Sequence, residues 1–207
     1  MAQTDGAGEA TAKKKKKRNT KDLILAGAFA ALYVVLMLVI VMGSSIISPV
    51  LYILAPLTVG TVTGAVYTLA VLKARSIVPV IVMGGLFLLL ASSTNPVSAG
   101  LTALWTALAC AILVTGKFKS KRVYNLSFIV YNLTMTAPFA MLAYARETFI
   151  SMARDILGDA YADSLAAVTP NWIYLGIIGL ALAGGVIGAL LANKLIAKHF
   201  AKAGIVN

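Results

Sequence analysis

Six apolar segments, each about as long as a lipid bilayer is thick, restrict what this sequence can fold into. They are residues 23–42, 50–72, 76–92, 97–115, 123–145 and 172–192. A transmembrane helix needs roughly 20 predominantly apolar residues. Soluble domains are about 45–50% apolar, whereas hydrophobic residues make up 60% of this chain of 207 residues. We therefore predict an all-α integral membrane protein with six transmembrane helices.

Positive charge gathers in alternate loops between these segments. Lysine and arginine precede the first segment, separate the second from the third and the fourth from the fifth, and follow the sixth. They are Lys13 to Arg18, Lys21, Lys73, Arg75, Lys117, Lys119, Lys121, Arg122, Lys194, Lys198 and Lys202. Six alternating helices place all of them on one side of the membrane. Because basic loops stay in the cytoplasm, we predict cytoplasmic termini and a multi-pass protein of the bacterial cytoplasmic (inner) membrane.

The two ends of the chain differ in composition from the part between them. Residues 1–21 are small and polar and then strongly basic, which predicts a disordered cytoplasmic tail. Its lysines lie next to the first apolar segment, which favours binding to anionic membrane lipid over nucleic acid. Residues 22–194 form the predicted six-helix membrane domain, and residues 195–207 form a second basic cytoplasmic tail.

The loop of residues 146–170 is predicted to be extracellular and amphipathic. Its apolar residues recur at helical spacing, with acidic residues on the opposite side. The apolar residues are Phe149, Met152, Ile156, Leu157, Tyr161 and Leu165. We expect this loop either to pack at the membrane interface or to cover a solute site as a lid.

The membrane segments lack acidic side chains and histidine. Between Asp22 and Glu147 there is no aspartate, glutamate or histidine, and the sixth segment has none either. Proton-coupled carriers need a titratable group in the membrane, metal enzymes need carboxylate or imidazole ligands, and hydrolases need a base beside the nucleophile. The single cysteine, Cys110, cannot form an intrachain disulfide, and no Walker A motif is present. We therefore expect no enzymatic activity, no catalytic residue, no cofactor and no metal site.

A polar stripe runs along the fifth segment. The sequence Tyr-Asn-Leu-Ser at 124–127 returns as Tyr-Asn-Leu-Thr at 131–134, so that Asn125 and Asn132 share one helix face. An amide that faces lipid finds no hydrogen-bond partner. The stripe is therefore expected to bond to neighbouring helices or to line a solute site, and for Asn132 both interpretations stay open. Pro138 predicts a kink nearby.

Small residues four positions apart predict close approach between helices. The pairs are Ala26 and Ala30 in the first segment, Gly60 and Gly64 in the second, and Gly184 and Gly188 in the sixth. We expect the two glycine pairs to serve packing within the protein. The alanine pair would serve either internal packing or the docking of another protein.

The sequence from about residue 20 to residue 200 resembles the S components of energy-coupling factor (ECF) importers. The resemblance rests on six short spans, a basic N-terminus, and Ala26 with Ala30 in the first span. More narrowly, TKDLILAGAFAALYVVLMLV and NPVSAGLTALWTALACAIL are similar to the Trep-Strep or MptD-type branch. The resemblance implies an S-component-like bundle that docks on a transmembrane T component driven by two ATPase subunits. It also implies that Ala26 and Ala30, with Gly27 and Ala31 beside them, form the docking surface.

An S component captures its solute from outside, so the resemblance implies a site at the outer ends of the helices. The candidate substrate-binding residues are Asn95, Thr102, Trp105, Asn132, Thr136, Tyr144, Asn171, Trp172 and Tyr174. Alternative roles also fit several of them. Tyr and Trp at span ends are typical of the aromatic belt at lipid headgroups, Asn95 precedes a proline as turn residues do, and Trp105 fits core packing.

The leading interpretation is the solute-binding S component of an ATP-driven ECF-type importer that captures a small nutrient, such as a vitamin or a related micronutrient. Its partners would be a T component, two ATPase subunits and membrane lipid, without nucleic acid. An alternative is a stand-alone oligomeric channel or facilitator for small solutes, whose pore the polar stripe would line. A third is a membrane assembly factor that binds no solute.

Overall fold

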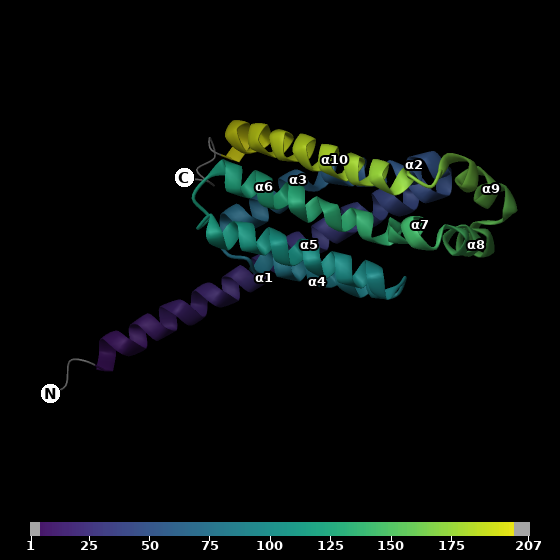
Figure 1. Ribbon diagram of the computed structural model, residues 1–207. Coiled ribbons are helices and arrows are strands. Elements are labelled where there is room, and N and C mark those ends of the chain that lie inside the picture. Colours follow the sequence, from purple (N-terminus) through teal and green to yellow (C-terminus); the bar gives the residue numbers. More distant parts are fainter. Residues whose placement is uncertain (1–4, 201–207) are drawn as a thin grey trace.

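The computed structural model is a bundle of long helices (Figure 1). It describes the backbone of residues 5–200 and the side chains of residue 24 and residues 26–198, and in this part of the chain every regular element is helical, with no strand. The elements are α1 (Asp5–Ile47), α2 (Pro49–Ile53), α3 (Ala55–Ala74), α4 (Val78–Ser92), α5 (Pro96–Thr115), α6 (Lys121–Asn132), η1 (Leu133–Ala140), α7 (Met141–Tyr144), α8 (Arg146–Leu157), α9 (Asp159–Val168), α10 (Ile173–Leu195) and η2 (Ile196–Phe200).

Five helical stretches in the described part of the chain are long and apolar enough to cross a membrane. They are Ala26–Ile47, Ala55–Ala74, Pro96–Thr115, Lys121–Tyr144 and Ile173–Lys198. The all-helical membrane fold is therefore confirmed. The third predicted span corresponds to α4, an apolar helix of 15 residues. At ~1.5 Å per residue it is about 22 Å long, shorter than the roughly 30 Å hydrocarbon layer. A sixth crossing and the side of the termini stay predictions.

Helix α1 extends well beyond the apolar segment that it contains. It begins at Asp5, and its N-terminal part projects away from the bundle (Figure 1). This part includes residues 5–21, for which the sequence predicts a disordered tail. The structure has a helix here that is continuous with the first span, and alanine, glutamate and lysine all favour helix. Residues 1–4 and 201–207, the outer parts of the two predicted tails, lie outside the described residues.

The long helices form a ring in which each contacts the next. Helix α1 packs against α3 and α4, α4 against α5, α5 against α6, α6 against α10, and α10 against α3. Helix α6 continues through η1 and α7, with a change to 3₁₀ geometry over Leu133–Ala140, which contains Pro138. Proline has no N–H to donate within a helix, and the kink predicted here corresponds to this change in geometry.

Helices α3 and α10 cross at the two glycine pairs. A Cβ atom at Gly64 would lie 2.6 Å from the carbonyl carbon of Gly188, and one at Gly184 would lie 2.5 Å from the carbonyl oxygen of Leu57. Any side chain would therefore separate the two backbones. Gly60 also lies in this contact, where its carbonyl oxygen faces Gly188. The expectation that the glycine pairs serve internal packing is confirmed.

The predicted extracellular loop folds into the two helices α8 and α9. Both lie at the end of the bundle opposite the C-terminal end of α10 (Figure 1). A second hydrophobic cluster forms beneath them, separate from the main core. Its buried members are Ile53, Phe139, Leu142, Leu165 and Ile177. The α8–α9 hairpin is thus packed onto the bundle through apolar side chains.

Candidate functional site

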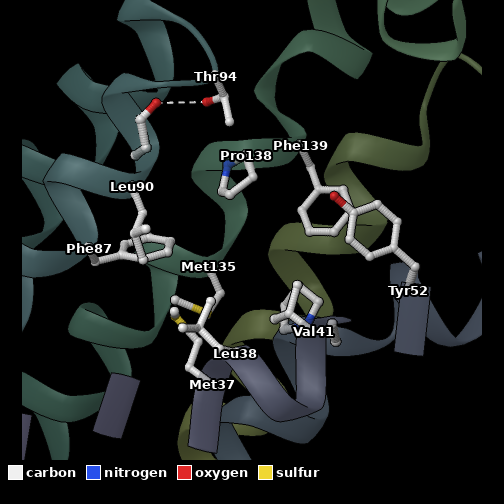
Figure 2. Close-up of a pocket in the computed structure, with 13 residues that line it drawn as sticks. Met37, Leu38, Val41, Tyr52, Phe87, Leu90, Thr94, Met135, Pro138 and Phe139 are labelled. Carbon is white, nitrogen blue, oxygen red and sulfur yellow. Dashed lines mark hydrogen bonds between the residues drawn. The ribbon is translucent and has the colours of Figure 1, made fainter. Parts of the chain in front are cut away.

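Two adjoining cavities lie beneath the α8–α9 hairpin. The first has a volume of about 160 Å³ and lies among α1, α2, α3, α4 and η1 (Figure 2). The second has a volume of about 400 Å³ and lies between the C-terminal part of α1 and the hairpin. Both are lined by Val41, Tyr52, Thr94 and Pro138. Because these four residues are shared, we treat the two cavities as one continuous space, named here the hairpin cavity.

The walls of the first cavity are apolar and partly aromatic. Figure 2 shows Phe87 and Leu90 of α4 on one side, with Tyr52 and Phe139 on the other. The ring centroids of Tyr52 and Phe139 are 4.8 Å apart. Two methionines of α1 and η1, Met37 and Met135, complete the wall. A ligand in this space would be held mainly by contact with rings and flexible thioethers.

The hairpin supplies the outer wall of the second cavity. All six apolar residues that the sequence places on one side of the 146–170 loop line it. The apolar side of the hairpin therefore faces the bundle. Leu165 is only 1% exposed, whereas Ile156 is 77% exposed, so the cavity opens toward the C-terminal end of α8. The arrangement is a covered cavity with a lateral mouth.

Two arginines form bonds within the hairpin. The Arg146 guanidinium donates hydrogen bonds to the carbonyl oxygens of Thr169, at 2.6 Å, and Ala166, at 2.7 Å, which satisfies acceptors left free at the C-terminus of α9. Arg154 pairs with Asp159 at 2.5 Å and with Asp163 at 2.8 Å. Hydrogen bonds to Asp159 and then Asp163 raise the pKa of Arg154. Neither arginine lines the hairpin cavity.

The hairpin cavity is uncharged. Among the described residues, no lysine, arginine, histidine, aspartate or glutamate lines either part of it. The Ser45 hydroxyl donates to the Met42 carbonyl at 2.9 Å, and the Thr94 hydroxyl donates to the Ala91 carbonyl at 2.7 Å. The buried Tyr161 hydroxyl has no hydrogen-bond partner within the described part of the chain. Burial raises the pKa of Tyr161, so this hydroxyl remains a neutral donor.

The polar stripe of the fifth segment faces α10 and α3. The Asn132 side chain is fully buried and donates hydrogen bonds to the carbonyl oxygens of Pro56, at 3.1 Å, and Ala181, at 2.7 Å. Asn125 accepts a hydrogen bond from Asn193 at 3.1 Å. Asn132 thus joins three helices where α3 and α10 cross. Two interpretations were left open for Asn132, bonding between helices and lining a solute site. In the structure its amide nitrogen bonds to neighbouring helices.

Several other candidate residues gather at the N-terminal end of α5. Asn95 caps this helix by accepting the Ser98 N–H at 2.8 Å, and the exposed Tyr144 donates to the same Asn95 oxygen at 3.2 Å. The Thr102 hydroxyl is buried and donates to the Ser98 carbonyl at 2.8 Å. Trp105 is half-buried further along α5, and its indole nitrogen is buried without a partner among the described residues.

The remaining candidates lie on η1 and at the start of α10. The Thr136 hydroxyl is buried and donates to the Leu133 carbonyl at 2.7 Å. Asn171 and Trp172 are exposed, and Tyr174 is half-buried against the second hydrophobic cluster. None of the nine candidates lines the hairpin cavity. The residues that do line it are mostly apolar. Only those of the 146–170 loop could be recognised from the sequence, through their helical spacing.

The predicted docking residues lie on two different faces of α1. Ala26 and Ala30 are fully buried within the bundle. Gly27 and Ala31 are exposed, and no atom outside the helix lies within 4 Å of the position that a Cβ at Gly27 would take. Only the second pair is open to a partner in this structure.

Comparison with known proteins identifies the family of the chain. The model of a family described as hypothetical bacterial integral membrane protein (Trep_Strep) matches residues 20–202. No curated protein and no solved structure matches. The matched region contains the apolar part of α1, the other helices of the ring and the hairpin cavity. The chain therefore belongs to the Trep_Strep family of bacterial integral membrane proteins.

Proposed function

We propose that this protein is the solute-binding S component of an ATP-driven importer of the ECF type. The observation that carries the proposal is the hairpin cavity, a covered space at one end of a membrane bundle with a lateral mouth beside α8. Such a partly open, mostly apolar pocket between helices is typical of small-molecule sites. With cytoplasmic termini, as the loop charges predict, this end of the bundle faces outward. The solute would then be captured from outside.

A buried aromatic cluster favours a binder over a channel. Tyr33, Tyr67, Phe128 and Tyr131 are all fully buried. Successive ring centroids lie 5.6 Å apart for Tyr33 and Tyr131, 5.0 Å for Tyr131 and Tyr67, and 5.2 Å for Tyr67 and Phe128. A pore through the middle of the bundle would have to displace this cluster.

The cluster lies next to the hairpin cavity, on the side toward the middle of the bundle. Tyr33 precedes the cavity residue Met37 by about one helical turn, and Tyr131 precedes Met135 by the same interval. The cavity therefore ends at packed rings rather than continuing toward the basic end of the bundle. A solute that enters it would need a movement of the whole protein, driven by a partner, to leave on the other side.

The proposed coupling surface is the exposed face of α1 with Gly27 and Ala31. Small residues let a partner helix approach closely in a membrane. Since Ala26 and Ala30 are buried, they support this face from inside and do not themselves contact the partner. The T component would pack here, and its two ATPase subunits would supply the energy. The protein itself would catalyse no reaction.

The test is complex formation with a T component and two ATPase subunits from the source bacterium. The wild-type protein should copurify with this module, and reconstituted vesicles should take up solute only with ATP. Gly27→Trp/Ala31→Trp should abolish copurification. Gly179→Trp, at another open helix surface on α10, is the matched control and should not. Failure of the wild-type protein to form the complex would overturn the proposal, and ATP-independent transport by the chain alone would identify a facilitator.

A further inference from the structure

We infer that the hairpin cavity accepts an uncharged, largely apolar aromatic molecule that carries a hydrogen-bond acceptor for the Tyr161 hydroxyl. The inference rests on the proposed function in that it names the chemical class of the solute. Three properties of the cavity carry it: the absence of charge among its described lining residues, the chemistry of its walls, and the buried, unpartnered hydroxyl of Tyr161.

The lack of charged lining residues excludes an ionic solute. Moving an ion from water into an apolar site carries a large free-energy cost unless an opposite charge or several hydrogen bonds compensate. Arg146 and Arg154 are the cations nearest in sequence to the lining residues of the hairpin, and both are engaged in bonds within it. A carboxylate or a phosphate in the cavity would therefore remain uncompensated, and an ammonium group would meet no carboxylate among the described lining residues.

The side chains that line the cavity favour a ligand with an aromatic ring. Phe87 stands across the first cavity from Tyr52 and Phe139 (Figure 2), so a flat molecule between them would meet aromatic surfaces from both sides. Five of the seven methionines of the chain line the hairpin cavity. They are Met37, Met42, Met135, Met141 and Met152. Thioethers make favourable contacts with aromatic rings and adapt to irregular shapes.

Tyr161 supplies the polar contact. Tyr161 lines the second cavity, and its hydroxyl is buried without a partner among the described residues. A buried donor without a partner is costly, and a ligand oxygen or nitrogen would remove that cost. The hydroxyls of Ser45 and Thr94 already donate to backbone carbonyls. A ligand with one or two polar atoms thus fits the cavity better than a sugar, whose many hydroxyls would stay unpaired.

The test uses two radiolabelled probes that share one bicyclic ring, with the protein in lipid nanodiscs. 2-Naphthol is an uncharged bicyclic ring with one hydroxyl, and 2-naphthalenesulfonate carries a permanent negative charge on the same ring. Binding is measured by scintillation proximity against empty nanodiscs, which corrects for partition into lipid. We expect saturable binding of 2-naphthol that is at least tenfold tighter than binding of the sulfonate.

Two variants assign the binding to the hairpin cavity. Ala153→Trp should fill the second cavity, which Ala153 lines, and weaken 2-naphthol binding at least tenfold. Tyr161→Phe keeps the ring and removes only the hydroxyl, and it should weaken binding about threefold to tenfold. Ala160→Trp, on the exposed side of α9, is the control and should bind as the wild type does. All three variants should elute and unfold as the wild-type protein does.

Equal or tighter binding of the sulfonate would overturn the inference, as would the lack of saturable 2-naphthol binding. Binding that Ala153→Trp leaves unchanged would also overturn it, since the probe would then occupy another place. These outcomes are independent of copurification with the ATPase module. A failed copurification with normal probe binding rejects the proposed function alone, and a normal copurification with preferred sulfonate binding rejects the solute class alone.

Discussion

The two sides of the bundle are packed in opposite ways. Where α3 crosses α10, glycines bring the two backbones into direct contact, and the Asn132 amide bonds to both helices. Between α1, α4 and η1, large flexible side chains meet and still leave the hairpin cavity. Backbone contacts and buried hydrogen bonds define one distance between helices, whereas methionine and leucine side chains can repack. The comparison indicates a rigid wall that supports an adaptable site.

The largest expected effect comes from breaking the rigid wall. Gly188→Leu would force a side chain into the Gly60 carbonyl and the Phe128 ring, and we expect it to destabilise the fold by about 4 kcal/mol or more. The variant should aggregate or run as a broad peak in size-exclusion chromatography. Gly179→Leu lies on the same helix with no atom within 4 Å of its Cβ position and should behave as wild type. Equal behaviour of the two variants would contradict the proposed role of the crossing.

The second prediction compares the two faces of α1. Ala26→Trp overfills a buried position and should lower the stability of the protein by about 3 kcal/mol. Gly27→Trp, on the exposed face, should leave the thermal midpoint nearly unchanged while it weakens association with the coupling module. Thermal unfolding in detergent checks the first effect and copurification the second. A stable Ala26→Trp variant that fails to bind the module would move the docking surface to the face that the sequence first suggested.

A smaller effect is expected from Asn132→Ala. The change removes two hydrogen bonds between helices, which should cost about 2 kcal/mol. Because Asn132 does not line the hairpin cavity, 2-naphthol affinity should stay within about twofold of wild type. Thermal unfolding and probe binding measure the two quantities on one sample. A loss of binding at unchanged stability would make Asn132 a solute contact after all.

The smallest effect is expected in the α8–α9 hairpin, which covers the hairpin cavity. Arg146→Ala removes the hydrogen bonds to two carbonyls at the C-terminus of α9 and should lower the local stability of α9 by about 1 kcal/mol. Hydrogen exchange in residues 159–168 should then become faster, with little change elsewhere. Arg154→Ala is the matched control, since its ion pairs are exposed and screened by solvent. Faster exchange in the control alone would contradict the assigned role of Arg146.

How far the sequence predicts the fold is best seen in α10 and the hairpin. Helix α10 was expected over residues 172–192 and is found at Ile173–Leu195, because a long apolar run is unambiguous. The spacing of Phe149 and Leu165 identified the apolar side of the loop at 146–170, and that side lines the cavity. The distinction between packing at the membrane interface and covering a site was not accessible, since both need the same amphipathic spacing.

The candidate site residues chosen from the sequence differ from the residues that line the hairpin cavity, for a chemical reason. Sequence reasoning selects polar and aromatic residues near span ends, and this selects helix caps such as Asn95 and helix-to-helix bonds such as that of Asn132. The walls of the cavity are instead residues such as Met135 and Phe87. In a membrane protein an apolar side chain can face lipid, core or ligand, so its position in the sequence does not distinguish the three.

The sequence by itself determined that the chain is an all-helical membrane protein, where its apolar helices lie, and that its membrane segments carry no aspartate, glutamate or histidine. These properties follow from composition and from runs of residues along the chain, which local chemistry decides. The tertiary structure decided that Gly64 meets Gly188, that Ala26 faces inward while Gly27 faces outward, and that space remains beneath the hairpin. Those properties depend on how side chains from distant segments pack together. Because protein interiors are closely packed, such contacts are defined only in the folded structure.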